Sequence, residues 1–246
     1  MRIHQLIAYI LTLSLIFCSA AAEAMPAQTL RLVFDYEGSV KSNEEIPPMG
    51  LKILRSEILS VTFLDSLKDA PSSAVDYSAN HNGSVLAWAV PHGDLYDVFV
   101  AAEGGVIANE NSSYLFYCYT SLVEVNFNGC FDMFNTTGVV SMFENCKSLT
   151  EMDMSELDFS SVKNASFMFA GCEKLKSVTL SNFDRESADT THMFGDIAVK
   201  EKPSEESKSA MNEYPCSGCG KLEQFPFKPR GVMPVYCRDC WNNLFG

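Results

Sequence analysis

Two copies of one pattern set the architecture of this chain: MFENCKSLTEMDM at residues 142–154 and MFAGCEKLKSVTL at residues 168–180. A more divergent copy precedes them and ends in LVEVNF at residues 122–127, and a truncated copy begins at residue 193. One phenylalanine in each copy marks the period, with intervals of 27, 26 and 25 residues: Phe116, Phe143, Phe169 and Phe194. A repeat of this length predicts a solenoid, because a single unit of that size cannot bury its apolar face alone.

The apolar residues within each copy follow L-x-x-φ-x-φ, where φ is an apolar residue. Because the last two alternate with polar residues, they indicate a short, half-buried strand. We expect parallel strands near residues 122–127, 149–154 and 175–180, with the phenylalanines aligned on the opposite wall of the core. Cys146 and Cys172 share one position of the repeat. Buried thiols are favoured there over a disulfide, since free cysteine is among the most buried residue types.

The segment MFENCKSLTEMDMSELDFSSV, residues 142–162, resembles the repeat of BspA-like bacterial surface proteins, which reads roughly MFxxCxxLTxLDLSxFDTSxVT. The similarity extends over about residues 28–196 and is weakest at RESAD, residues 185–189, where the usual Thr-Ser-x-Val is missing. This resemblance implies an exposed leucine-rich-repeat solenoid that binds a ligand or adheres to a surface. It implies no catalytic residues.

The region before the repeats is rich in strand patterns. Residues 30–34 predict one strand, and residues 85–90 and 95–100 predict a hairpin around the Pro/Gly turn at residues 91–94. We expect this region to cap the first coil of the solenoid, with Trp88 in its core.

Candidate catalytic groups are few. His81 and His92 lie in turn-like segments, and His92 is close to Asp94 in the sequence, but no nucleophile or metal-ligand partner recurs nearby. The repeat carboxylates Asp158 and Asp184 are typical of groups that accept hydrogen bonds from a turn backbone. We therefore predict that the protein is not an enzyme.

Four cysteines near the C-terminus form two CxxC pairs: Cys216 with Cys219 and, seventeen residues later, Cys237 with Cys240. Each pair can aim both sulfurs at one ion, and two pairs complete a closed tetrahedral site for structural Zn²⁺. Two local disulfides or redox-active pairs are the alternatives. The segment also resembles a zinc-ribbon family through PFKP at residues 226–229 and PVYCRDC at residues 234–240. This resemblance implies a ribbon fold around the metal.

The N-terminal residues have the pattern of a secretory leader. An apolar run at residues 6–17 is followed by the cleavage pattern AEA at residues 22–24. The run is short for a transmembrane helix, so a cleaved signal peptide is favoured. Export normally favours disulfides, which conflicts with a thiolate zinc site.

We expect a fold class between α/β and mainly β, with the chain divided as follows: signal peptide 1–24, N-terminal cap region 25–112, BspA-like repeats 113–198, flexible linker 199–213 and zinc ribbon 214–246. Residues 25–198 carry 24 acidic and 10 basic residues, a net charge of −14. Such a body repels nucleic acid and anionic membrane.

These observations predict an exported or cell-surface binding or adhesion protein, with a protein or glycan ligand on the solenoid face. After signal cleavage no stable membrane span is expected. Two alternatives remain: an intracellular zinc-ribbon protein that contacts nucleic acid or protein, and a secreted enzyme of unrecognised type.

Overall fold

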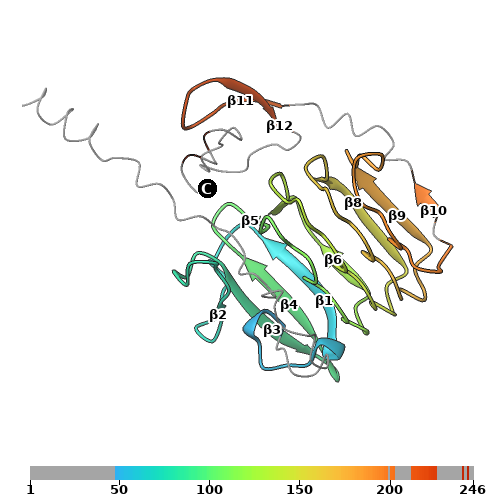
Figure 1. Cartoon of the computed structure of the whole chain (residues 1–246). Helices are drawn as coiled ribbons and strands as arrows, with labels where there is room; N and C mark the ends of the chain where they lie inside the picture. The colour runs from blue at the N-terminus through green and yellow to red at the C-terminus, as the bar shows by residue number, and fades with distance from the viewer. Residues whose placement is uncertain (1–47, 199, 203–211, 226–239, 241–242, 244–246) are drawn as a thin grey trace, which may run out of the picture.

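The computed structural model describes residues 48–198, 200–202, 212–225, 240 and 243. Its regular structure is nearly all β-strand, apart from two short 3₁₀ turns, η1 (Pro48–Gly50) and η2 (Arg55–Glu57) (Figure 1). The largest sheet has five strands, in the order β2 (Val75–Asp76), β3 (Leu86–His92), β4 (Leu95–Ala101), β1 (Ile58–Leu64) and β6 (Glu124–Asn126). The next has three strands, in the order β10 (Lys200–Lys202), β9 (Ser177–Ser181) and β8 (Glu151–Asp158). Two pairs complete the set: β5 (Val106–Ile107) with β7 (Phe131–Asp132), and β11 (Asn212–Pro215) with β12 (Leu222–Phe225).

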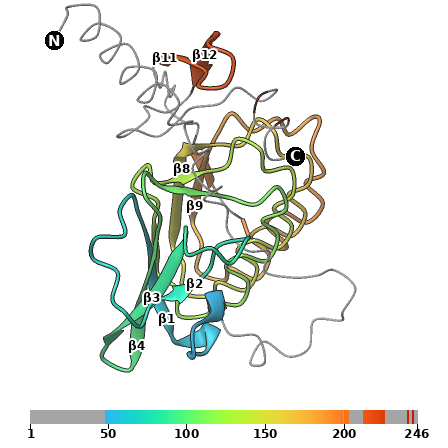
Figure 2. The ribbon, with the colours of Figure 1, turned by 90° about the vertical axis from the view of Figure 1, so that its left-hand side faces the viewer.

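Successive copies of the sequence pattern stack on one another. A row of single parallel bridges joins Asn111 to Gly138, Gly138 to Asn164 and Asn164 to Asp189. We use these residues as boundaries and name the stretches between them unit 1 (111–137), unit 2 (138–163) and unit 3 (164–188). Figure 2 shows the strands on one wall of this stack and the turns of successive units, one behind another, on the other wall.

The turn wall is joined by a regular ladder of backbone hydrogen bonds, each of which links one unit to the next. The N–H of Phe116 donates to the carbonyl of Met142 at 2.9 Å, and that of Phe143 donates to Met168 at 2.8 Å. The N–H of Phe169 continues the ladder to Met193 at 2.7 Å. Each unit therefore satisfies its backbone groups through its neighbour, as backbone buried away from water must.

The phenylalanines form a continuous stack inside this wall. Ring centroids are 4.9 Å apart for Phe116 and Phe143, 5.4 Å for Phe143 and Phe169, and 5.7 Å for Phe169 and Phe194. The first three side chains are fully buried. This confirms the predicted alignment of Phe116, Phe143 and Phe169 in the core.

Two backbone positions in each unit adopt the left-handed conformation, two residues before and two residues after the core phenylalanine. Their φ angles lie between 51° and 71°: Tyr114, Ser141, Phe167 and His192 before it, and Cys118, Asn145 and Gly171 after it. These turns bend the chain sharply on both sides of the buried ring. The recurrence of so uncommon a conformation at the same position shows that the units share one backbone shape.

Cys146 and Cys172 form the expected column of thiols. Both are fully buried and neither forms a disulfide. The Cys146 thiol donates to the carbonyl of Phe116 at 3.2 Å, and the Cys172 thiol donates to that of Phe143 at 3.0 Å. Burial raises the pKa of the Cys146 thiol well above its usual value. Tyr119, also fully buried, occupies the equivalent position in unit 1.

The N-terminal region covers the open end of unit 1. The hairpin of β3 and β4 is antiparallel as predicted, and Trp88 is 8% exposed, as expected for a core residue. β1 pairs in parallel with β4 on one side and with β6 on the other, so it joins this region to the repeats. Its Phe63 packs on Phe127 and Phe131, with ring centroids 5.8 and 4.4 Å away. The strand predicted at residues 30–34 and the leader at 1–24 lie outside the described residues.

The strand wall differs from the prediction in one respect. β8 and β9 pair in parallel, but β6 pairs with β1 and is not a neighbour of β8, so the wall consists of two sheets. Unit 1 has one more residue than unit 2 between its strand and its turn aspartate, and Asn128 and Gly129 both have positive φ there. On the facing strand, the β8–β9 register shifts between Met154 and Asp158. An early turn on one strand and a bulge on the other prevent a common register.

β10 lies at the start of the segment expected to be a flexible linker. It pairs in parallel with β9, Lys200 opposite Ser177 and Lys202 opposite Thr179, so it supplies the strand of the truncated fourth copy. The L-x-x-φ-x-φ pattern did not reveal it, because its sequence, KEK, has no apolar residue. Charged residues are common on the outermost strand of a sheet, where they hinder pairing with other chains.

Candidate functional site: an acidic groove and a zinc centre

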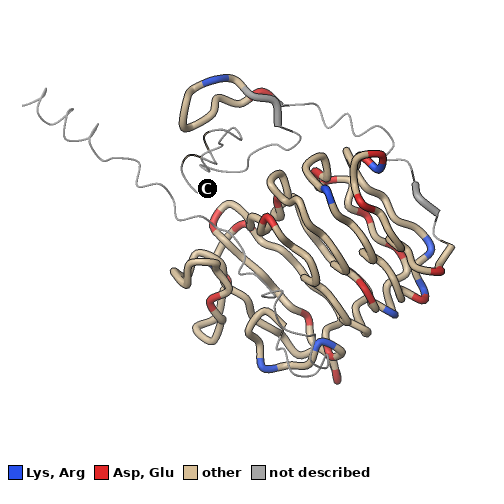
Figure 3. Tube along the Cα trace, in the orientation of Figure 1, with Lys and Arg blue, Asp and Glu red and all other residues tan. Residues whose placement is uncertain are grey.

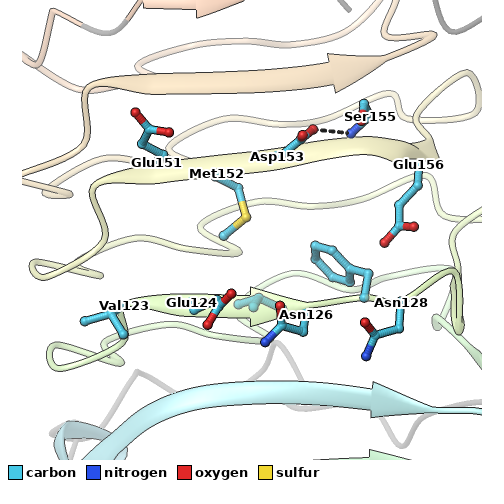
Figure 4. A pocket seen from close by; sticks show the side chains of 11 residues that line it. Val123, Glu124, Asn126, Asn128, Glu151, Met152, Asp153, Ser155 and Glu156 are labelled. Carbon is cyan, nitrogen blue, oxygen red and sulfur yellow. Dashed lines mark hydrogen bonds between the residues drawn. The ribbon is translucent and has the colours of Figure 1, made fainter.

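The break in the strand wall forms a groove, which we call the seam. Its volume is about 460 Å³, within the range of ligand-binding sites. The lining comes from the two facing segments (Figure 4): Val123, Glu124, Val125, Asn126, Phe127 and Asn128 on the β6 side, and Glu151, Met152, Asp153, Ser155 and Glu156 on the β8 side.

The seam has an apolar floor and a polar rim. Val125, Phe127 and Met152 are at most 9% exposed, because they face the core shared by units 1 and 2. Glu124 and Glu156 are exposed on opposite sides. Figure 4 shows that Glu156 projects from β8 toward β6, from the part of the strand where the register shifts. The bulge therefore brings a carboxylate to the seam.

Strands β1 to β9 carry one sign of charge. β1 to β9 contain eight acidic residues and no lysine or arginine, and the seam lining has four of the acids: Glu124, Glu151, Asp153 and Glu156. The basic residues of the described repeats lie outside these strands (Figure 3). One of them, Lys147, forms an ion pair with Glu173 at 2.8 Å. The electrostatic potential at the seam is therefore negative.

The aspartates considered in the sequence analysis act as turn acceptors. A carboxylate oxygen of Asp158 accepts the N–H of Ser160 at 3.0 Å, and one of Asp184 accepts the N–H of Glu186 at 3.1 Å. Asp153 in the same way accepts the N–H of Ser155 at 3.0 Å. This confirms the interpretation that these carboxylates hold turns.

Asp132 is the equivalent residue of unit 1, and sequence reasoning missed it. It accepts the N–H of Phe134 at 2.9 Å, but burial, with a smaller contribution from the nearby charge of Asp158, raises its pKa to about 6. The 26-residue spacing from Asp132 to Asp158 and from Asp158 to Asp184 is the signal that could have found it. A raised pKa means that the ionised form of the carboxylate is disfavoured. Here the position of Asp132 in the turn accounts for the raised pKa without a catalytic role.

His92 has a different partner from the one that its neighbours in the sequence suggested. Its Nδ1 lies 2.8 Å from a carboxylate oxygen of Asp97, across the β3–β4 hairpin, and not beside Asp94. The hydroxyl of Ser60 donates to the other oxygen of Asp97 at 2.5 Å. The Ser60 hydrogen bond is the main cause that lowers the pKa of Asp97, and His92 adds to it. In a catalytic triad the histidine contacts the hydroxyl, and the carboxylate contacts the histidine. Here Asp97 lies between the Ser60 hydroxyl and the His92 imidazole, so the three residues are not in the order of a triad.

Three of the four predicted zinc ligands meet in space. The sulfurs of Cys216, Cys219 and Cys240 all lie within 4.8 Å of one another. Zn–S bonds of about 2.3 Å in a tetrahedron place sulfurs about 3.8 Å apart, so the cluster fits one shared ion. Cys237 lies outside the described residues.

The first pair is held by a hairpin, whereas Cys240 of the second pair is helical. The N–H of Cys216 donates to the carbonyl of Lys221 at 2.8 Å, which closes the turn between β11 and β12, and that of Gly220 donates back to Cys216 at 2.7 Å. Cys240 is in α-helical conformation, as is Asn243. The CxxC spacing also fits a tight turn, as expected for a zinc ribbon. Because residues three apart also share one face of a helix, the CxxC spacing alone cannot distinguish the two arrangements.

Two protein families match parts of the chain. Residues 210–244 match the family described as a probable treble clef zinc finger, and residues 111–206 match the family described as Mycoplasma protein of unknown function, DUF285. The second match begins at Asn111, the first residue of the bridge row. No curated protein and no solved structure matches the chain. The family match and the three converging sulfurs thus show that the C-terminal segment is a zinc module with a structural metal.

Within the described residues, no helix is long and apolar enough to cross a membrane.

Proposed function

We propose that the protein is an exported or surface-displayed binding protein, whose strand wall holds a protein or glycan ligand and whose zinc module has a structural role. The observation that carries this proposal is the seam, a groove of about 460 Å³ on the strand wall with an apolar floor and an acidic rim. Proteins recognise ligands mainly through such concave sites, in which apolar surface supplies affinity and a few polar groups supply specificity.

The proposed architecture is a leucine-rich-repeat solenoid of the BspA-like type. It is supported by the stacked phenylalanines, the backbone ladder between units and the parallel β8–β9–β10 sheet. In a solenoid each unit contacts only its neighbours, so an extended wall stays available for binding.

The proposed zinc site uses Cys237 as the fourth ligand beside Cys216, Cys219 and Cys240. A fourth sulfur would close the coordination sphere and leave no position for water, so the ion would stabilise the fold and would not act in catalysis.

A non-enzymatic role is further supported by the use of the repeat aspartates in turns. The absence of lysine and arginine from β1 to β9 argues against a nucleic-acid ligand on this wall, because phosphate contacts dominate such binding.

One experiment tests location and metal together. Cells expressing the full chain are fractionated, and the protein from each fraction is analysed by N-terminal sequencing and zinc determination. We expect a mature N-terminus near Met25, one zinc ion per chain, and recovery from the envelope or the medium. An intact N-terminus on protein from the cytosol would contradict the proposal of export.

A further inference from the structure

The seam lies between two strand edges that pair with no other strand in the part of the chain that the structure describes. β6 is the last strand of the five-stranded sheet and β8 the last strand of the three-stranded sheet, so the two face each other without being hydrogen-bonded neighbours. On the opposite wall the same two units are joined without a break, from Phe116 to Met142 and from Cys118 to Glu144. Units 1 and 2 are thus hydrogen-bonded to each other through their turns, whereas their strands β6 and β8 are not paired.

The backbone direction on β6 follows from its pairing with β1. The carbonyl of Leu64 accepts the N–H of Ala102 and so faces β4, and alternation along β1 turns Val61 toward β6. Because Val61 is opposite Val125 in a parallel pair, it bonds to the two neighbours of Val125, and the backbone groups of Val125 itself face the seam. Edge groups of this kind are a template for pairing with an added strand.

The backbone direction on β8 follows in the same way. The carbonyl of Thr150 accepts the N–H of Lys176 at 2.8 Å and so faces β9. Alternation then turns the backbone groups of Asp153 toward the seam. Both edges of the groove thus present backbone donors and acceptors beside carboxylate side chains.

We propose that the seam binds an extended segment of a partner protein that carries lysine or arginine. Its backbone pairs with an open edge of β6 or β8, and a basic side chain lies among Glu124, Asp153 and Glu156. Addition of a strand to a sheet edge is a recurring mode of peptide recognition, in which main-chain hydrogen bonds supply affinity and side-chain sites supply specificity. Charge complementarity selects the basic segment, since four carboxylates and no cation line the groove. This inference rests on the proposed binding function of the strand wall.

The test uses the full zinc-loaded chain and a fluorescein-labelled peptide of four Lys-Val repeats, with four Glu-Val repeats as the charge control. We expect only the Lys-Val peptide to bind, and more weakly as salt is raised. The variant Glu124→Gln/Glu156→Gln should weaken binding by about tenfold, because each exposed ion pair contributes up to about 1 kcal/mol and 1.4 kcal/mol is tenfold.

The matched control is Glu110→Gln/Glu186→Gln, which makes the same charge change at two exposed residues outside the groove. It should leave binding of the Lys-Val peptide within about twofold, since those charges do not touch the probe. Two Lys-Val peptides, each N-methylated at one of the two sets of alternate residues, test backbone pairing. Loss of binding is expected for at least one of them, because methylation removes the donors that face the sheet edge.

Three outcomes would overturn the inference: equal weakening by both double variants, full binding of both N-methylated registers, or no binding of the Lys-Val peptide. A glycan array run on the same samples separates this failure from that of the proposed function. Glycan binding that is lost in Glu124→Gln/Glu156→Gln would overturn the peptide inference and keep the strand wall as a binding surface. If neither the peptide, the array nor a panel of extracellular-matrix proteins binds, both proposals fail.

Discussion

The repeat units and the zinc module are stabilised in different ways. In units 1 to 3 each turn of chain buries a phenylalanine, a cysteine or tyrosine and several aliphatic side chains against the next, and the backbone is hydrogen-bonded from unit to unit. The zinc module has one short hairpin in its described part and three sulfurs that converge on a point. A repeat array can grow its core by adding units, whereas a module of about thirty residues is too small to fold without a staple.

Removal of zinc should separate the two regions most clearly. Chelation, or Cys219→Ser, should unfold the zinc module and leave the repeats folded, because binding of structural zinc supplies about 10 kcal/mol or more of folding free energy to such modules. Hydrogen exchange should show lost protection at residues 212–225 and unchanged protection at residues 142–180. The matched control is Cys130→Ser, since Cys130 donates to the carbonyl of Asn128 within the repeats and serine can do the same. Full zinc content in Cys219→Ser would contradict the assignment of this ligand.

Phe143→Ala should have the largest effect on the repeats. The ring is fully buried and stacks between Phe116 and Phe169, so its loss leaves a cavity in the middle of the stack. We expect the free energy of unfolding to fall by about 3–5 kcal/mol, with zinc content unchanged. Urea denaturation followed by far-UV circular dichroism measures the change. A loss below 1 kcal/mol would show that the units do not depend on the stack.

Gly171→Ala should test how closely the units stack. Gly171 has φ +71°, and an added Cβ would lie 2.2 Å from Oδ1 of Asn145 in the unit before. We expect a loss of about 2 kcal/mol, part from backbone strain and part from displacement of Asn145.

Gly83→Ala separates those two parts. Gly83 has φ +72° but no atom within 4 Å of an added Cβ, so its substitution should cost only about 1 kcal/mol of strain. Asn145→Gly combined with Gly171→Ala should recover part of the loss, because the glycine removes the clashing side chain and suits the positive φ of that position. Equal losses for Gly171→Ala and Gly83→Ala would argue against close stacking.

Asp132→Asn should raise stability near neutral pH. The pKa of Asp132 is raised to about 6, so between about pH 4 and pH 6 the folded protein holds a proton that the unfolded chain has released. The stability contributed by this group therefore falls as pH rises through that window. Asparagine keeps the acceptor for the N–H of Phe134 and removes the partly buried charge. We expect a gain of about 1–2 kcal/mol at pH 7.5 and little change at pH 4.

Asp184→Asn is the contrasting variant at the same position of unit 3. There the hydrogen bonds from Ser187 and Glu186 lower the pKa of an exposed carboxylate. Its contribution is present above its usual pKa and is lost as pH falls below that value, so Asp184→Asn should lower stability at pH 7.5. Thermal melts at pH 4 and pH 7.5 compare the two variants. The same sign of change at pH 7.5 would refute the assigned difference in burial.

The period, the parallel β8–β9 pair, the buried phenylalanines and the four candidate metal ligands could all be predicted from the amino-acid sequence. These features follow from residue type and spacing, because an apolar residue at a fixed position of each unit must face the shared core. Asp158 and Asp184 were also predictable, since an aspartate after a strand is a common turn acceptor.

Four features became visible only in the folded chain: the seam, the strand of the fourth copy, the raised pKa of Asp132 and the helical conformation of Cys240. The first three of these depend on residues far away in the chain, and the CxxC spacing does not distinguish a turn from a helix at Cys240. β6 pairs with β1 and not with β8, because the turn at Asn128 and Gly129 and the bulge of β8 prevent a common register between units 1 and 2. Strand pairing is a property of two segments together, and a pattern read along one of them does not contain the other.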